Sequence, residues 1–265
     1  MPVESLTRAN LRQAIFCVHS PFVHGDAGER MLRRLEEWLG RGTLRGQVAW
    51  TQEGEPSGFV LYYPIEAAPM EMGGEGFYAI QCLFVQPGGW GQGVGRALVE
   101  AAIRDAQKQG ASGLAVEGFS FPPDEEGFEF MPQNFFRKMG FREVASGGPA
   151  ALLFLPLGPE AKAPSYLEAS FTPPAGGDRL RIDLLNCERC CVSVSNCEAV
   201  KQVAGDYSDR VEIHEHDQNS RQAVLEKGMA IGIFMDGELA FYGPPITEEQ
   251  AREEMERRLT QRASG

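Results

Sequence analysis

The feature that most constrains this chain is an apolar run that ends in a glycine-rich turn and continues as an amphipathic helix. Residues 78–85 are apolar enough to form a buried strand. Gly91, Gly93 and Gly95 follow, at the start of a helix expected over about 94–108. The free N–H groups in the first turn of a helix, together with the helix dipole, favour a negative charge. This stretch therefore predicts a binding site for a phosphate or pyrophosphate.

Composition excludes several classes of function. The 265 residues carry 25 basic and 37 acidic side chains, which gives a net charge of −12 and argues against a nucleic-acid or anionic-membrane partner. No apolar run approaches the roughly 20 residues needed to span a bilayer, and the N-terminus lacks the basic and apolar pattern of a signal peptide. We therefore expect a cytoplasmic protein of one large domain or two ordinary ones. The sequence carries no signal for an oligomeric state.

The first part of the chain mixes helices and strands around this turn. Hydrophobic spacing and turn residues predict further helices over 7–16, 28–40 and 132–139, and strands over 46–52, 57–63, 113–118, 141–144 and 150–155. This order indicates a domain of the α/β class.

Two motifs in this part resemble the GNAT N-acetyltransferases. The loop Gly91-Gln92-Gly93-Val94-Gly95-Arg96, directly after Leu83-Phe84-Val85, resembles the acetyl-CoA loop of that family, and Asn134-Phe135-Phe136-Arg137-Lys138-Met139-Gly140-Phe141 resembles its F-Y-x-K-x-G-F segment. The resemblance covers about residues 5–157 and implies a GNAT mixed sheet flanked by helices. It also implies acetyl-CoA as cosubstrate and a small-molecule or peptide amine as acceptor. A dinucleotide-binding fold is the alternative for a glycine loop alone, but no acidic residue ends a following strand at the usual distance.

The resemblance also implies a set of cofactor contacts. These would come from the end of the apolar strand, the glycine loop and the second motif: Leu83, Phe84, Val85, Trp90, Gly91, Gln92, Gly93, Val94, Gly95, Arg96, Asn134, Phe136 and Arg137.

Two catalytic positions depart from the family. Its usual glutamate base falls at Gln81 and its usual tyrosine acid at Phe136, and neither side chain can exchange a proton at neutral pH. Glu117, Tyr78 and Cys82 are the candidates to replace them. A route that takes its proton from solvent also stays open.

An amine acceptor is expected to meet the loop of residues 17–24, where family members close over their substrate. Cys17, His19 and His24 are the candidate substrate-binding residues there, with plain surface residues as the alternative for the histidines. A further acidic stretch could attract a cationic amine or be a solvated loop; it contains Asp124, Glu125, Glu126 and Glu129.

The second part of the chain follows a connector rich in proline and glycine, over 158–178. It reads as strands over 180–185, 209–214, 230–235 and 239–242, with helices over 196–203, 220–227 and 247–259. Together with the CxxC motif of Cys187 and Cys190, this order resembles the thioredoxin-like fold. That fold has a proline at the position of Met229, so disulfide exchange lacks one expected element.

The cysteines of this part allow three interpretations. A dithiol of Cys187 and Cys190 near a helix N-terminus is expected to have a lowered pKa and to be reactive. A soft-metal site could instead use Cys191 and Cys197 with His214 and His216. Inert thiols are the third interpretation.

We therefore expect three segments: a GNAT domain at 1–157, a linker at 158–178 and a thioredoxin-like domain at 179–265. This order resembles the bacterial YoaP-like acetyltransferases. The expected function is transfer of an acetyl group from acetyl-CoA to an amine, with a thiol-containing accessory domain. The alternatives are an acyl-CoA-binding sensor without turnover, whose cysteine module responds to metal or redox state, and a thiol oxidoreductase.

Overall fold

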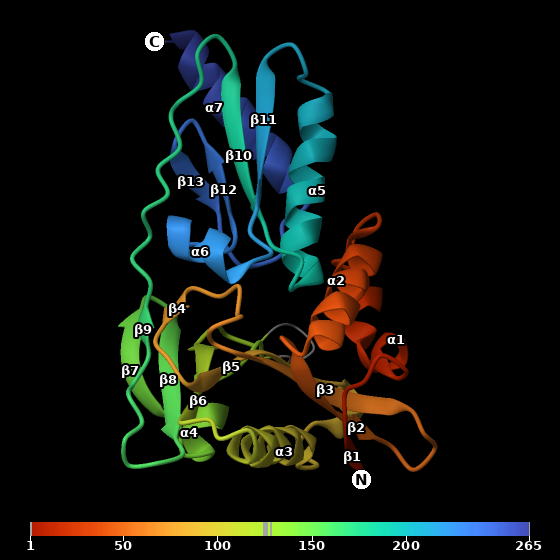
Figure 1. The fold of residues 1–265 in the computed structure, drawn as a ribbon. Helices are drawn as coiled ribbons and strands as arrows, with labels where there is room; N and C mark the ends of the chain where they lie inside the picture. Colours follow the sequence, from red (N-terminus) through yellow and green to blue (C-terminus); the bar gives the residue numbers. More distant parts are fainter. Residues whose placement is uncertain (1, 124–126, 128, 265) are drawn as a thin grey trace. The chain divides into compact units, whose positions relative to one another are not determined.

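The computed structural model describes residues 2–123, 127 and 129–264, and the chain divides into two units (Figure 1). Unit 1 comprises Met1–Phe16 and Leu35–Leu167, and unit 2 comprises Cys17–Arg34 and Glu168–Gly265. The acidic residues 124–126 of the expected acceptor-attracting stretch lie outside the described residues. In the described part of the chain, no helix has the length and apolar character needed to cross a membrane.

The units differ from the expected segments at two places. Cys17–Arg34 groups with the second unit because Arg30 and Arg34 form ion pairs with Glu188, at 3.0 and 2.8 Å. The beginning of the expected linker groups with the first unit because it contains β9 (Ser165–Tyr166), which pairs with β4 (Met72–Gly73).

Unit 1 is built on a mixed sheet with the strand order β1-β2-β3-β5-β6-β8-β7. The strands are β1 (Val3–Ser5), β2 (Arg45–Trp50), β3 (Pro56–Pro64), β5 (Phe77–Val85), β6 (Gly113–Phe119), β7 (Arg142–Gly147) and β8 (Ala150–Pro156). β5 and β6 are parallel, and the other neighbours are antiparallel. A parallel pair needs a crossover connection, and α3 (Val94–Lys108) supplies it.

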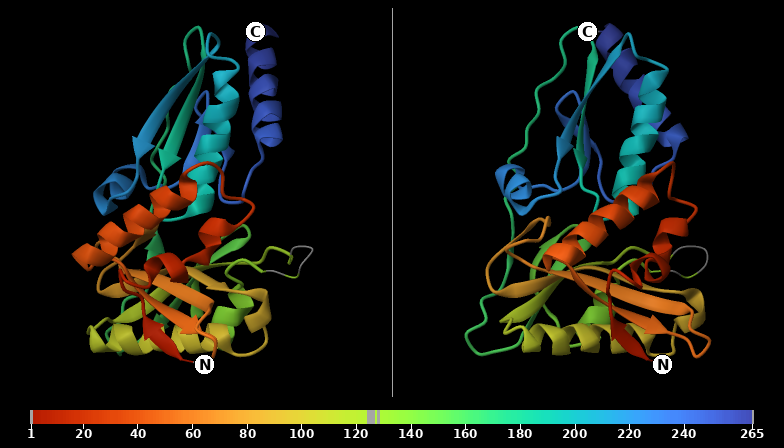
Figure 2. Two further views of the ribbon diagram at one scale, coloured as in Figure 1. Left: turned by 90° about the vertical axis from the view of Figure 1, so that its right-hand side faces the viewer. Right: turned by 45° about the vertical axis from the view of Figure 1, so that its right-hand side comes forward.

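Helices cover both faces of this sheet (Figures 1 and 2). Besides α3, the helical elements are α1 (Leu11–Ala14), α2 (Ala27–Arg41), α4 (Gln133–Lys138) and the 3₁₀ turns η1 (Phe16–His19) and η2 (Pro87–Gly89). The division between the two units falls within α2. Leu98, Val99 and Ala102 of α3 pack on Val60 and Ile80 of the sheet to form the main core of the unit. This core fixes α3, and therefore its N-terminus, against the strand that precedes the glycine loop.

Unit 2 has a smaller sheet with the strand order β11-β10-β12-β13. Its elements are β10 (Leu180–Asn186), α5 (Cys191–Gly205), β11 (Val211–Asp217), α6 (Arg221–Lys227), β12 (Gly232–Met235), β13 (Glu238–Phe241) and α7 (Glu248–Ser264). β10 and β11 are parallel, and β12 is antiparallel to both of its neighbours. Figure 2 shows α5 and α7 on one face of this sheet and α6 on the other.

Several elements differ from the sequence predictions. The helix predicted over 7–16 is only the short α1 followed by η1, and β1 precedes it. The helix predicted over 196–203 begins five residues earlier, at Cys191, and runs to Gly205. Its cysteine, serine and valine residues have modest helix propensity, but most of them are buried in unit 2, so tertiary packing stabilises the longer helix.

Candidate functional site

The glycine loop leaves main-chain N–H groups free at the start of α3. Gly91 and Gly93 have φ angles of +72° and +80°, and an added Cβ at either would meet no atom within 4 Å. The hydrogen-bond ladder of α3 begins with Ala97 N–H donating to Gly93 O at 3.0 Å. The N–H groups of Val94, Gly95 and Arg96 precede this bond, as the first turn of a helix requires. No acidic side chain lies in that turn, so the site is open and favours a negative charge.

Two polar side chains of the loop stabilise its shape. The Trp90 indole N–H donates to Val85 O at 2.9 Å, and the Gln92 amide donates to Gly88 O at 2.6 Å. Arg96 is exposed and lies 3.9 Å from Glu100, so its guanidinium can turn toward a ligand at little cost. Within the glycine loop, Arg96 is thus the predicted cofactor contact that carries a positive charge and is free to change its orientation.

β5 and β6 separate beside this loop. Their parallel pairing ends at Ile80 and Val116, while β5 continues to Val85 paired with β3 only. A register shift against β3 leaves Gln81 as a bulge on β5, which bends the strand at this point. The N–H of Leu83 points into the resulting gap, where it donates to the sulfur of Met131 at 3.1 Å. The gap therefore presents a main-chain donor from β5 at Leu83, while cofactor contacts by residues 83–85 stay a prediction.

Glu117 lies at the edge of this gap, and a tyrosine that the sequence analysis missed lies next to it. Val116 belongs to the core under α3, so the next residue, Glu117, is on the opposite face of the sheet. Burial, and after it the negative charge of the Glu117 carboxylate, raises the pKa of Tyr166, whose buried hydroxyl has no hydrogen-bond partner among the described residues. Tyr166 belongs to β9, a two-residue strand inside the expected linker, which no periodicity could reveal.

The other two catalytic candidates lie on different faces of the sheet. Cys82 pairs with Leu61, whose neighbour Val60 is in the core, so Cys82 shares the face of Glu117. Tyr78 packs against Tyr62 with ring centroids 5.7 Å apart, on the α3 side. Burial raises the pKa of Tyr78. The structure therefore brings Cys82 and Glu117 to one face and separates Tyr78 from them.

The second motif places a different phenylalanine at the loop from the one predicted. Phe136 is fully buried in the core beside Phe141, so its ring is not available to a cofactor. Phe135 is only partly buried, and a Cβ on Gly95 would lie 3.4 Å from its ring. The burial of Phe136 does not favour its predicted cofactor contact, and Phe135 is the phenylalanine of α4 that lies at the loop. Asn134 and Arg137 are exposed, and Arg137 pairs with Glu143.

The expected substrate loop, residues 17–24, belongs to unit 2. His19 and His24 are exposed, and the His24 main-chain N–H donates to Ser195 Oγ at 3.0 Å. Cys17 lies at Cys191, whose sulfur is 3.8 Å from Cys17 O. The structure thus links the loop to α5 and does not bring Cys17, His19 or His24 into one unit with Glu117.

The cysteines around the start of α5 differ from the reactive dithiol predicted. Cys187 is fully buried, and Cys190 is the N-cap residue of α5. An interaction with the Cys191 thiol and burial raise the pKa of Cys190 well above its ordinary value, although main-chain N–H groups of Val192 and Ser193 oppose this. The pKa of Cys191 is raised to about 12, mainly by an interaction with Cys17 and to a smaller extent by burial. The expectation of a lowered thiol pKa is therefore wrong for Cys190, because burial among thiols outweighs the helix N-terminus.

The described residues also contain no group of three His, Cys, Asp or Glu side chains placed to hold a metal ion. His216 instead contacts the buried Asp183 at 2.8 Å, and Arg181 binds the same carboxylate at 2.7 Å. The predicted soft-metal alternative thus lacks a ligand set in this part of the chain.

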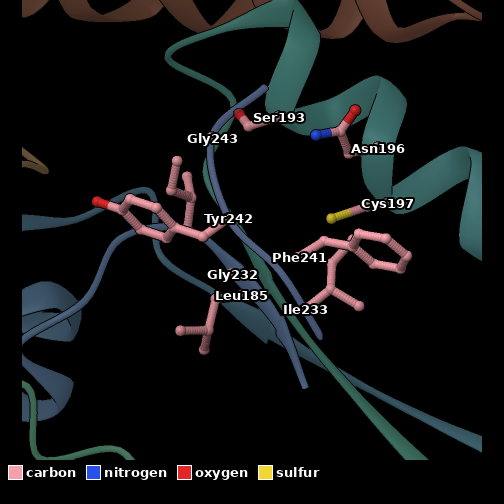
Figure 3. Close-up of a pocket in the computed structure, with 10 residues that line it drawn as sticks. Leu185, Ser193, Asn196, Cys197, Gly232, Ile233, Phe241, Tyr242 and Gly243 are labelled. Carbon is pink, nitrogen blue, oxygen red and sulfur yellow. The ribbon is translucent and has the colours of Figure 1, made fainter. Parts of the chain in front are cut away.

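A cavity in unit 2 lies between α5 and the end of β13 (Figure 3). Its volume is about 10 Å³, which holds one water molecule at most. Asn196 on its wall donates to Pro244 O at 2.9 Å and accepts from Ile246 N–H at 3.0 Å. Burial raises the pKa of Cys197, beside it, to about 12. This cavity is a structural feature and not a ligand site.

Unit 1 therefore offers three chemical functions. The α3 N-terminus can hold a phosphate, the Leu83 N–H can donate to a carbonyl oxygen in the gap, and Glu117 can accept a proton on the opposite face. These three functions are those required to bind a phosphate-containing acyl donor and transfer its acyl group.

Part of the chain is similar to a known family. Residues 12–141, just under half of the chain, match the acetyltransferase (GNAT) family. No curated protein sequence matches the chain significantly.

Solved structures similar to the chain are distant. A putative GNAT acetyltransferase from Desulfovibrio desulfuricans is 17% identical over 59% of this chain and 100% of its own, with a TM-score of 0.43. The Escherichia coli GNAT protein YhbS in complex with CoA is 18% identical over 60% and 83%, with a TM-score of 0.44. A GNAT acetyltransferase from Brucella melitensis in complex with acetyl-CoA is 16% identical over 61% and 92%, with a TM-score of 0.40.

Proposed function

We propose that the chain is an N-acetyltransferase that moves an acetyl group from acetyl-CoA to a small-molecule or peptide amine. One observation carries this proposal: an open, positive-φ glycine loop at the α3 N-terminus lies directly after a strand whose Leu83 N–H points into a gap in the sheet. A CoA pyrophosphate suits the first feature and a thioester carbonyl suits the second. The family match and the CoA complexes of similar structures point the same way.

The residues have the following proposed roles. The N–H groups at the start of α3 bind the pyrophosphate, and Arg96 adds a mobile positive charge. Glu117 takes the proton of the attacking amine as its nitrogen bonds to the carbonyl carbon. The Leu83 N–H stabilises the oxyanion until the carbon–sulfur bond breaks, and solvent supplies the proton for the departing thiolate. The buried Tyr166 hydroxyl, which has no hydrogen-bond partner among the described residues, interacts electrostatically with Glu117 and is the group proposed to orient its carboxylate.

Calorimetry with acetyl-CoA tests the binding step. Gly93→Trp fills the open space above the loop and should abolish binding. Gly110→Trp is the matched control, because Gly110 also has a positive φ, meets no atom within 4 Å and lies just beyond the other end of α3. The proposal requires the control to bind like the wild type. Absence of binding by the wild type contradicts it.

An acyl-CoA sensor without turnover is the second candidate. It is favoured by Gln81, which cannot titrate and accepts a hydrogen bond from Tyr63 at 3.3 Å, and by the burial of Phe136. Thiol release from acetyl-CoA over a panel of amines separates the two. An enzyme releases CoA with at least one amine, and Glu117→Gln suppresses that release. A sensor binds acetyl-CoA and releases none with any amine.

We further propose a thioredoxin-like fold for the accessory unit, and with it the YoaP-like type. The sheet order β11-β10-β12-β13, with one parallel pair and a final helix, supports this proposal. The raised pKa values of Cys190 and Cys191 favour a structural or binding role over rapid disulfide exchange. Incubation of the protein with a disulfide substrate and an excess of a small dithiol as reductant tests this role, since catalysed reduction of the substrate would restore the oxidoreductase alternative.

A further inference from the structure

Met131 occupies the gap between β5 and β6. Its sulfur accepts the hydrogen bond from Leu83 N–H at 3.1 Å, and its own carbonyl accepts one from Phe119 N–H at 2.9 Å. The next residue, Pro132, makes a parallel bridge with Phe119. Met131 is 2% exposed and belongs to the core under α3. One residue therefore connects the two strands where their own pairing has ended.

The contact to Leu83 is a weak one for a buried main-chain donor. A thioether sulfur is a poor acceptor, whereas a carbonyl oxygen is a strong one. Methionine is also unbranched and has three side-chain torsions, so it can leave a site without moving the backbone. A carbonyl oxygen that reaches the gap can therefore replace the Met131 sulfur on the same N–H.

The backbone at Met131 is also unusual. Its φ of +44° lies in the left-handed region, where a residue with a long side chain is uncommon and costs about 1 kcal/mol or more. Such a conformation persists where the surrounding structure requires it. Here the bonds to Phe119 and Leu83 on either side impose it, so the side chain is directed into the gap by the fold.

We propose that Met131 is the residue that determines the size of the acyl group, because its side chain fills the space beside the donor that receives the thioester carbonyl. This inference rests on the proposed function and deepens it. An acetyl group fits once the sulfur leaves Leu83, while the remaining methionine chain excludes a longer acyl group. Short-chain acyl-CoA thioesters are then the substrate class, with acetyl-CoA preferred.

Two substitutions separate the acceptor role of the sulfur from the bulk of the side chain. Met131→Leu keeps the bulk and removes the acceptor, so Leu83 N–H is unpaired in the free protein and gains a partner only when a carbonyl binds. Acetyl-CoA should then bind on the order of tenfold more tightly. Met131→Ala removes the bulk, and the ratio of butyryl-CoA to acetyl-CoA affinity should rise about tenfold, as two buried methylenes imply. Calorimetry with both thioesters measures these changes.

Met139→Leu is the matched control, because Met139 packs on the same core from the end of α4. It should leave both affinities unchanged. If the wild type binds acetyl-CoA but both Met131 variants keep its affinities and its preference, the inference is wrong and the proposed function stands. If the wild type binds neither thioester, the proposed function fails and the inference fails with it.

Discussion

Asp105 should fix the orientation of α3 and with it the anion site at the other end of that helix. Its carboxylate accepts hydrogen bonds from Arg45 at 2.5 and 2.8 Å, and from the Tyr62 hydroxyl at 2.7 Å. Gln47 donates to the same hydroxyl at 2.9 Å. Burial alone would raise the pKa of Asp105, but the bonds from Arg45 and Tyr62 outweigh it and hold the pKa below its ordinary value. The charged carboxylate is therefore the form that stabilises the fold.

Asp105→Asn should lower the free energy of unfolding of unit 1 by about 2 kcal/mol, because at least one hydrogen bond to a charged group is lost. The Asp105 side chain is 14% exposed and that of Arg45 33%, so solvent screens the pair only partly. A lowered pKa in the folded state means that the carboxylate contributes its full stabilisation above its ordinary pKa of 3.8. The difference between wild type and variant should therefore hold at neutral pH and shrink as the pH falls below about 4.

Urea unfolding followed by tryptophan fluorescence measures this effect. All three tryptophans, Trp38, Trp50 and Trp90, belong to unit 1, so the signal reports that unit alone. Glu100→Gln is the control on the same helix, since its pair with Arg96 is long and exposed and is worth less than about 0.5 kcal/mol. Equal losses for the two variants, or a difference that grows in acid, would refute the reasoning.

The remaining predictions concern the catalytic centre and unit 2. Tyr166→Phe should reduce kcat for CoA release more than it changes KM and should shift the pH profile of kcat, whereas a purely structural role would leave the profile in place. Cys190 and Cys191 should react with iodoacetamide at pH 8 more slowly in the folded protein than in urea, as mass spectrometry of the peptides can show, because their raised pKa values keep them as thiols. Gly228→Ala should destabilise unit 2 by more than about 3 kcal/mol in urea unfolding followed by circular dichroism, because its φ is +69° and a Cβ would lie 1.9 Å from a main-chain oxygen. Gly205→Ala, where a Cβ meets nothing within 4 Å, should change little.

The anion site could be predicted from the sequence because its geometry follows from local residues. The bounds of α3 agree with those expected, since apolar positions recur at helical spacing and glycines with positive φ precede them. The mixed sheet of unit 1 was likewise predicted. Strands of two or three residues, such as β1, β4 and β9, carry no measurable periodicity and were missed.

The rest of the site depends on contacts between residues distant in the chain. The position of Phe135 at the loop follows from which side of a six-residue helix faces the core. The raised pKa of Cys190 follows from its burial beside Cys191 and not from its place at the N-cap of α5. Neither property is encoded in the spacing of the motif, so the motif alone does not tell which phenylalanine lies at the loop or how burial shifts the pKa of the thiol.

Tyr166 shows most clearly why cofactor binding is easier to infer than catalysis here. Donors for a pyrophosphate and a carbonyl come from the main chain, so a strand, a turn and a helix start are enough to define them. A proton-transfer group needs a partner that sets its orientation, and Tyr166, the residue proposed for that role beside Glu117, comes from β9, some fifty residues later in the chain. Because β9 pairs with β4 and Leu167 N–H donates to Glu71 O at 2.9 Å, the proposed catalytic unit extends through Leu167. A chain shortened to residues 1–157 should therefore retain the glycine loop and lack Tyr166. It should still bind acetyl-CoA, but its turnover should be reduced or lost.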